Sequence, residues 1–352
     1  MTRRPLSRRK RLVFAALALG LAFGALELVL TLGGVQYART PRSMKQAFVD
    51  DYIGWQNQNV ELLHFEPHPA RMWAPVPGVG LVNEDGLQGA RLPRERAPGR
   101  ARVLFLGDSC TNSLPDGYPA LTVAALAGRG VTAEPLVAAC GGYSTFQGAL
   151  FLEEALAWQP DAIVAYFGWN DHWVSALPDH AFVPTGALGQ LAGATVGRLR
   201  TYQLLHKLLH PPAPTGLLPR DPARLAAQAR VPPERFTENV RRITARAREA
   251  GLPVVWVVAP VAPHVVETDK SVLIGHTDLV PAVHELYARA LREAVAGAEG
   301  VRLVDLPPFD RRTMLADGIH PSPAGNAAIA EAVADALTGA LADALTERKE
   351  RP

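Results

Sequence analysis

Three polar residues from two distant parts of the chain, Ser109, Asp317 and His320, are of the types that together carry out acyl transfer. A serine hydroxyl is a weak nucleophile and needs a base beside it, which an imidazole can supply. An aspartate three residues before a histidine can place its carboxylate against the ring and fix the tautomer. Taken alone, a Gly-Asp-Ser tripeptide is better explained by a serine that caps a helix, and the Asp317–His320 piece is equally explained by a helix cap beside a surface histidine. The elements around them must therefore bring the three residues together.

Ser109 lies where an apolar strand ends, in the segment Ala101–Ser113. Val103–Leu106 is a continuous apolar run, typical of a strand buried on both faces, and Gly107-Asp108-Ser109 ends it with turn-forming residues. In an open α/β sheet, ligands bind outside the carboxyl ends of the strands, and a helix that begins there directs free N–H groups at an anion. We therefore expect Ser109 on a strand-to-helix turn at a binding edge.

The chain continues as alternating strands and helices. Apolar runs at Ala133–Ala139 and Ala162–Phe167 predict two more buried strands, and the polar loops Cys140–Ser144 and Gly168–Asp171 follow them. The remaining predicted helices and strands are Leu121–Gly130, Thr145–Gln159, Glu234–Ala250, Val254–Ala259, Asp278–Ala296 and Val301–Asp305. This alternation predicts an α/β fold, a three-layer α/β/α sandwich with a central parallel sheet, in which the loops converge on one edge.

Four separated pieces match one family in chain order: Gly107-Asp108-Ser109, the glycine before Tyr143, Gly168-Trp169-Asn170-Asp171, and Asp317-Gly318-Ile319-His320-Pro321. Over about residues 100–345 the chain resembles the SGNH hydrolases, also called GDSL-type esterases and lipases, whose sheet is flavodoxin-like. The first piece continues with Cys110 where the family's name suggests leucine, a departure that leaves the nucleophile untouched.

The resemblance implies roles for the matched residues. Ser109 would be the nucleophile, His320 the general base and Asp317 its orienting acid. The oxyanion hole would come from the Ser109 N–H, the Gly142 N–H, with Gly141 as a less favoured substitute, and the Asn170 side chain. Preorganised donors of this kind stabilise the charge that develops on the carbonyl oxygen.

We therefore predict a serine esterase that hydrolyses O-acyl groups, acetyl or short acyl, of an extracytoplasmic or cell-envelope glycan. The ester could equally belong to a lipid or another small molecule. One alternative is an O-acyltransferase that uses the same triad to modify an envelope polysaccharide. Another is a non-catalytic envelope-binding module on the same fold, which the complete triad disfavours. No cofactor or metal is expected. His206 and His210 have the spacing of a metal pair, but no third ligand accompanies them.

The N-terminus is basic, whereas the rest of the chain is mildly acidic. The 352 residues carry a formal net charge of +2, and six of the first 11 residues are basic: Arg3, Arg4, Arg8, Arg9, Lys10 and Arg11. An acidic body argues against a nucleic-acid partner, whose recognition needs basic patches on the folded domain.

Residues 12–34 are apolar except for Glu27, Thr31 and glycines, a stretch long enough to cross a membrane as a helix. We interpret them as a single transmembrane anchor, with residues 1–11 as a cytoplasmic tail and the catalytic domain on the extracytoplasmic side of the inner membrane. The alternative is a cleaved signal peptide and a secreted protein, with Leu12–Leu26 as the apolar core. Apolar residues resume after Glu27, which favours the anchor.

The remaining chain divides into an extended lead-in and one hydrolase domain. Residues 35–100 are rich in proline and glycine and receive no chemical role, whereas residues 101–346 form the predicted domain. Within it, residues 172–233 interrupt the alternation with prolines and leucines, and we interpret them as a cap over the site.

The sequence contains two cysteines, Cys110 and Cys140, and each adjoins a predicted site loop. If their strands are neighbours, the Cα atoms could come within disulfide distance, and an exported protein could oxidise them. Two buried thiols packed as small apolar residues explain the sequence equally well.

Overall fold

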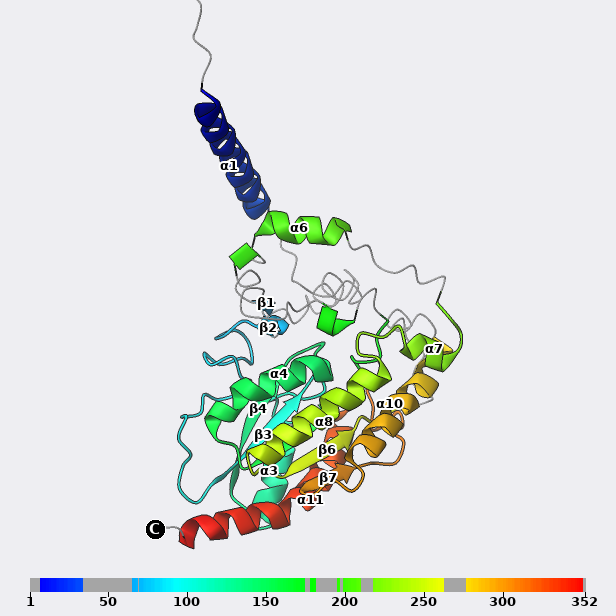
Figure 1. Ribbon diagram of the computed structural model, residues 1–352. Helices are drawn as coiled ribbons and strands as arrows, with labels where there is room; N and C mark the ends of the chain where they lie inside the picture. The colour runs from blue at the N-terminus through cyan, green and yellow to red at the C-terminus, as the bar shows by residue number, and fades with distance from the viewer. Residues whose placement is uncertain are drawn as a thin grey trace, which may run out of the picture.

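The computed structural model describes residues 7–33, 65–68, 70–174, 178–181, 195–196, 199–209, 218–262 and 277–350. Its centre is a parallel sheet, shown in Figure 1, with the strand order β4-β3-β5-β6-β7. The strands are β3 (Ala101–Gly107), β4 (Ala133–Ala139), β5 (Ala162–Phe167), β6 (Val254–Val258) and β7 (Val301–Val304). Along the chain this order is 2-1-3-4-5, that of a flavodoxin-like sheet.

Helices cover both faces of the sheet, which confirms the three-layer prediction. One layer contains α3 (Tyr118–Gly128) and α11 (Pro323–Glu350), which pack against each other. The opposite layer contains α4 (Thr145–Ala155), α8 (Pro233–Glu249) and α10 (Val280–Val295), where α8 contacts both of its neighbours. Right-handed crossovers explain the division, because the chain reverses its direction across the sheet after β4.

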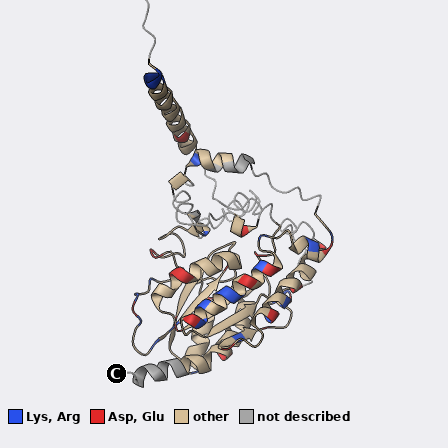
Figure 2. Cartoon of the chain, viewed as in Figure 1, with Lys and Arg blue, Asp and Glu red and all other residues tan. Residues whose placement is uncertain are grey.

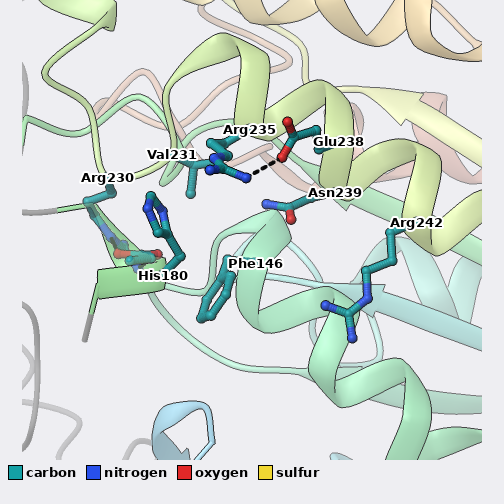
Figure 3. A pocket seen from close by; sticks show the side chains of 9 residues that line it. Phe146, His180, Arg230, Val231, Arg235, Glu238, Asn239 and Arg242 are labelled. Atoms are coloured by element: carbon teal, nitrogen blue, oxygen red, sulfur yellow. Dashed lines mark hydrogen bonds and ion pairs between the residues drawn. The ribbon is translucent and has the colours of Figure 1, made fainter. Parts of the chain in front are cut away.

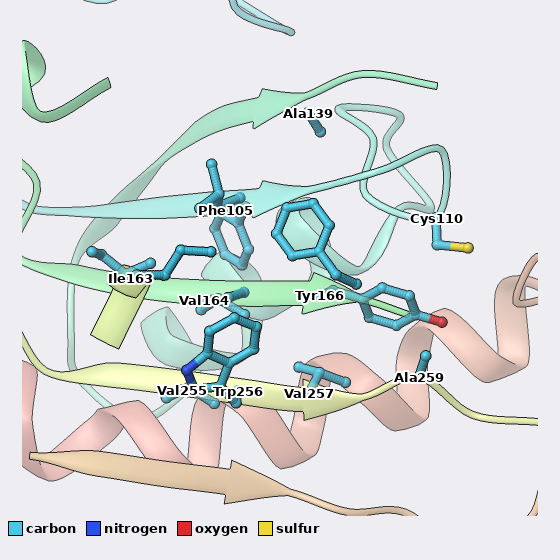
Figure 4. Packing of buried hydrophobic residues seen from close by; sticks show 14 of the residues in the cluster. Phe105, Cys110, Ala139, Ile163, Val164, Tyr166, Val255, Trp256, Val257 and Ala259 are labelled. Carbon is cyan, nitrogen blue, oxygen red and sulfur yellow. The ribbon is translucent and has the colours of Figure 1, made fainter. Parts of the chain in front are cut away.

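The core sits between these layers. All the residues of β3, β5 and β6 are buried, as the continuous apolar runs predict. In Figure 4, Phe105, Val164 and Trp256 project from three neighbouring strands into the packed interior. On the covering helix α8, the buried side chains recur at helical spacing: Phe236, Val240, Ile243 and Ala247.

The strand order reverses between β3 and β5, and this is where the site lies. The connection from β3 leads outward to β4, and the next connection returns to β5 on the other side of β3. The loops that follow β3 and β5 therefore diverge, and they leave a crevice at the carboxyl edge of the sheet. Ser109 follows one of these strands and Asn170 follows the other.

Part of the lead-in packs onto the domain. Strands β1 (Phe65–His68) and β2 (Met72–Pro75) form an antiparallel pair, and Met72 and Trp73 are buried in the main core. Further along, the Gln88 N–H donates to the Val137 carbonyl at 2.9 Å on the open edge of β4. The folded unit therefore begins before residue 101.

The N-terminal helix α1 (Arg8–Leu32) projects away from the sheet, and none of its residues is buried (Figure 1). It is long and apolar enough to cross a membrane, as the sequence predicts. In Figure 2, basic residues, coloured blue, lie at its outer end. Near its other end, the Glu27 carboxylate accepts the backbone N–H groups of Arg200 at 2.5 Å and Thr201 at 2.9 Å, which begin α6 (Arg200–Leu209).

The predicted cap is described only in part. Besides α6, it includes the short helix α7 (Pro222–Ala226) and one helical turn at Asp179–Ala181. His210 and the side chain of His206 lie outside the described residues.

Candidate active site

Ser109, His320 and Asp317 form one chain of hydrogen bonds. His320 Nε2 lies 2.8 Å from Ser109 Oγ, and His320 Nδ1 lies 2.6 Å from Asp317 Oδ2. All three side chains are partly buried, and the imidazole retains 21% of its exposure. The two halves of the arrangement are 211 residues apart in the sequence. This geometry lets the imidazole take the serine proton while the carboxylate holds the opposite ring nitrogen.

The loop that carries Asp317 and His320 is fixed by its own backbone. Asp317 Oδ1 accepts the N–H groups of Ile319 and His320, both at 2.9 Å, so the second carboxylate oxygen is left for the ring. Gly318 has φ of 68°, which favours glycine at this position. Helix α11 begins five residues after Gly318 and anchors the end of the loop.

The serine turn is tightly packed. The Asp108 carboxylate accepts the Cys110 N–H at 2.8 Å, and the Thr111 N–H donates to the Asp108 carbonyl at 3.1 Å. A Cβ atom at Gly107 would lie 2.1 Å from Thr111 Oγ1, so only glycine fits there. Burial raises the pKa of Asp108 to about 6.

Asn170 connects three loops through its side-chain amide. Nδ2 donates to Asp108 Oδ2 at 2.9 Å and to the Tyr143 carbonyl at 3.0 Å. The amide is therefore held at the crevice, as expected for an oxyanion donor. Both of its hydrogens already have acceptors, so a bound oxyanion would share one of them.

Gly142 occupies the third position of a β-turn. The Tyr143 N–H donates to the Cys140 carbonyl at 3.1 Å, Gly142 has φ of 77° and Gly141 has no positive φ, a combination typical of a type II turn. Within the described part of the chain, neither the Gly142 N–H nor the Ser109 N–H has a hydrogen-bond acceptor. The two backbone N–H groups predicted to bind an oxyanion therefore donate to no other part of the described chain.

Arg230, near the end of the predicted cap, donates a hydrogen bond to this turn. Its Nη1 donates to the Gly142 carbonyl at 2.8 Å, and its Nη2 lies 2.8 Å from Asp179 Oδ2. Ser144 Oγ donates to the same carboxylate oxygen at 2.7 Å, and both ionic side chains are fully buried. No motif or periodic pattern predicts this contact, because the arginine lies 88 residues from the glycine.

Asp171 supports the neighbouring helix. Its Oδ1 accepts the Thr145 N–H at 2.9 Å and the Thr145 hydroxyl at 2.5 Å, where α4 begins. The other carboxylate oxygen is buried and has no partner among the described residues. Burial raises the pKa of Asp171 to about 7.

The disulfide hypothesis is wrong: Cys110 and Cys140 are free, buried thiols. The strand register explains this, because Gly107 pairs with Ala139 and the Cys140 N–H donates to the Gly107 carbonyl. Cys110 lies three residues further along, in the turn, where its Sγ faces the Ile319 carbonyl at 3.6 Å. Figure 4 shows the Cys110 side chain directed away from Ala139 and the end of β4.

A separate pocket of about 220 Å³ opens between α4 and α8 (Figure 3). Its lining residues are Phe146, Asp179, His180, Arg230, Val231, Arg235, Glu238, Asn239 and Arg242. No residue of the triad lines this pocket, so it is distinct from the serine site. Among the described residues, no group of three or more His, Cys, Asp or Glu side chains could hold a metal ion.

The profile of the GDSL-like lipase/acylhydrolase family matches residues 105–328, more than half of the chain. The chain belongs to this family. This GDSL-like hydrolase is therefore an enzyme that acts on ester bonds through a serine. The matched region includes Ser109, Gly142, Asn170, Asp317 and His320 but not Trp73.

Three solved structures are examples of those similar to this GDSL-like hydrolase. TesA, known from a crystal structure, is 19% identical in sequence, with a TM-score of 0.42, and the match covers 68% of this chain and 99% of that chain. The lipase/acylhydrolase from Enterococcus faecalis is 17% identical, with a TM-score of 0.43 and coverage of 68% and 96%. The acetyl xylan esterase AlAXEase is 18% identical, with a TM-score of 0.41 and coverage of 67% and 99%. No match was found among curated proteins.

Proposed function

We propose that this hydrolase removes acetyl or short acyl groups from O-acylated glycans of the cell envelope, with Ser109, His320 and Asp317 as its catalytic triad. The observation that carries the triad is the continuous hydrogen-bond chain from Asp317 through His320 to Ser109. In the acylation step, Ser109 Oγ attacks the ester carbonyl while its proton passes to His320 Nε2. The N–H groups of Ser109 and Gly142 and the Asn170 amide stabilise the oxyanion.

The tetrahedral intermediate collapses when its bond to the alcohol oxygen breaks. His320 returns the proton to the departing alcohol, which leaves an acyl-serine. Water then attacks this ester, with His320 again as the base, and releases the carboxylic acid and free Ser109. Asp317 keeps the ring nitrogen Nδ1 protonated in both steps.

The proposed location follows from α1. After its basic first residues, Arg8, Arg9, Lys10 and Arg11, the helix is apolar except for Glu27 and Thr31. It contacts α6 through Glu27, and none of its residues is buried. By the positive-inside rule, the basic end remains in the cytoplasm and the hydrolase domain faces the extracytoplasmic side of the inner membrane. A domain tethered there meets envelope esters, which supports an envelope glycan as substrate.

A panel of p-nitrophenyl esters from acetyl to decanoyl, assayed with the full chain in detergent and with Ser109→Ala as control, tests the reaction. We expect the highest kcat/KM for acetyl or another short acyl group, and release of acetate from O-acetylated envelope glycan. Acylation of an added glycan acceptor in place of hydrolysis would identify a transferase. A preference for decanoyl esters would contradict the proposed acyl group.

A further inference from the structure

We propose that Trp73 is a positioning residue that selects the orientation of the Gly141–Gly142 peptide and thereby presents the Gly142 N–H to the oxyanion. This inference rests on the proposed function, because it concerns the oxyanion hole of the esterase. Trp73 lies in β2, outside the region that matches the family profile. Its indole Nε1 donates to the Gly141 carbonyl at 3.1 Å, and its side chain is 1% exposed.

The turn at Cys140–Tyr143 has two accessible forms. A type I turn and a type II turn share the hydrogen bond from the fourth N–H to the first carbonyl, but the central peptide is flipped between them. The type II form needs a positive φ at its third residue, which Gly142 supplies at 77°. Glycine also adopts the negative φ of a type I turn without steric cost, so the Gly-Gly sequence alone does not choose between the forms.

The contact with Trp73 makes this choice. The carbonyl and N–H of a trans peptide point in opposite directions, so an indole that holds the Gly141 carbonyl turns the Gly142 N–H away from Trp73. The same turn contacts the loop after β5, because Asn170 donates to the Tyr143 carbonyl at 3.0 Å. A flip to type I would also leave the buried indole N–H without its acceptor, which is unfavourable.

Trp73 is itself held in place by the turn that it orders. The Tyr143 hydroxyl donates to the Trp73 carbonyl at 2.7 Å, and the two rings pack edge to face with centroids 5.7 Å apart. Arg71 Nη1 donates to the same hydroxyl at 2.8 Å. The indole position is therefore well determined.

Arg230 contacts the same turn but has a different role. It binds the Gly142 carbonyl, which belongs to the peptide after the central one. The N–H of that peptide donates to Cys140 in both turn types. Arg230 thus fixes the position of the turn, whereas Trp73 distinguishes its two forms.

The test is Trp73→Phe in the detergent-solubilised full chain, which keeps an aromatic ring and removes the N–H donor. Trp256→Phe is the matched control. Trp256 lies in the core strand β6, and its buried indole donates to the Thr244 hydroxyl of α8 at 3.0 Å, a hydrogen bond that the substitution removes. We expect kcat for p-nitrophenyl acetate to fall about tenfold in Trp73→Phe with KM unchanged. Affinity for a trifluoromethyl ketone, which forms an oxyanion on Ser109, should fall by the same factor, whereas affinity for the matching unreactive alcohol should not.

A signal independent of turnover is the Gly142 amide resonance in protein labelled with [15N]glycine. We expect it to shift in Trp73→Phe and to stay in place in Trp256→Phe. If Trp73→Phe does not fold, 3-benzothienylalanine at position 73 keeps the shape of the indole and lacks only the N–H. An unmoved Gly142 resonance with wild-type kcat would overturn the inference even where Ser109 is essential. Wild-type protein without serine-dependent ester turnover would instead refute the proposed function, and the resonance would still report the turn.

Discussion

The side-chain amide of Asn170 lies 2.9 Å from the carboxylate of Asp108, which joins the ends of two neighbouring strands across the point where the strand order reverses. Asp108 is the middle residue of the serine motif, so the carboxylate that orders the nucleophile turn also orients the proposed oxyanion donor. One carboxylate therefore holds both the turn of the proposed nucleophile and the proposed oxyanion donor.

We expect Asn170→Ala to lower kcat by about 10²–10³ with little change in KM, because its donor acts on charge that appears only in the transition state. Asp108→Asn should act in the same direction, since an amide at 108 places a donor against either the Cys110 N–H or the Asn170 amide. Steady-state kinetics on a p-nitrophenyl ester measure both. Asp116→Asn, an exposed aspartate in the same loop, is the control. An increase of KM alone in Asn170→Ala would mean that Asn170 binds ground-state substrate.

Ser109→Ala and His320→Ala should each reduce ester turnover by several powers of ten while the thermal unfolding curve stays close to that of the wild type. A fluorophosphonate should label the wild type and leave Ser109→Ala unlabelled. Labelling of Ser109→Ala at the wild-type rate would show that another side chain is the nucleophile.

Asp171 makes stability depend on pH. Burial raises its pKa from 3.8 to about 7, so between about pH 4 and 7 the folded state binds a proton that the unfolded state has released. The contribution of Asp171 to the unfolding free energy therefore decreases as pH rises through that window and levels off above it. We expect Asp171→Asn to show a smaller decrease of Tm between pH 5 and pH 8 than the wild type. Asp108, whose raised pKa acts in the same direction, keeps part of the slope.

Thermal unfolding in buffers of matched ionic strength measures this slope. The control is again Asp116→Asn, which removes an exposed carboxylate and should leave the slope unchanged. Equal slopes for Asp171→Asn and the wild type would show that this carboxyl does not take up a proton in the folded state within that range.

Arg230→Gln should reduce the unfolding free energy by about 3–5 kcal/mol, because it leaves the fully buried carboxylate of Asp179 without its cationic partner. Arg235→Gln is the matched control, since its ion pair with Glu238 is exposed and contributes at most about 1 kcal/mol. Urea unfolding of the full chain distinguishes the two variants. Similar losses in both would show that the Arg230 pair is no stronger than a surface one.

The helix α1 should anchor the protein in the membrane. We expect the chain to stay in the membrane pellet after alkaline carbonate extraction, to be released by detergent, and to retain residues 1–26 when its intact mass is measured. A soluble exported form that lacks these residues would establish a cleaved signal peptide.

Two of the five strands of the parallel sheet could be predicted to the residue. Ala133–Ala139 and Ala162–Phe167 have the predicted bounds, because continuous apolar runs in a doubly covered sheet end abruptly at polar or glycine residues. The helix predicted at Glu234–Ala250 begins and ends one residue earlier, at Pro233 and Glu249. Proline fits the first turn of a helix, which accounts for the earlier start.

The contacts that Trp73 and Arg230 make with the turn at Cys140–Tyr143 could not be predicted. Trp73 and Arg230 lie 68 and 88 residues from the carbonyls to which they donate, and neither belongs to a periodic pattern or a short motif. The composition of the lead-in around Trp73 predicts turns and extended pieces, and only the fold shows that it contacts the turn at Cys140–Tyr143. The false disulfide has a related cause, because adjacency of two strands says nothing about where a turn directs the side chains beyond them.

The two buried thiols have a consequence for how the protein is made. Burial raises the pKa of Cys140 to about 12 and that of Cys110 well above its ordinary value, so neither offers a thiolate for exchange with an oxidant. The sequence holds no other cysteine, and folding of this domain needs no thiol oxidase or disulfide isomerase. The same native structure should form in a reducing cytoplasm, where a secreted enzyme stapled by disulfides would fail.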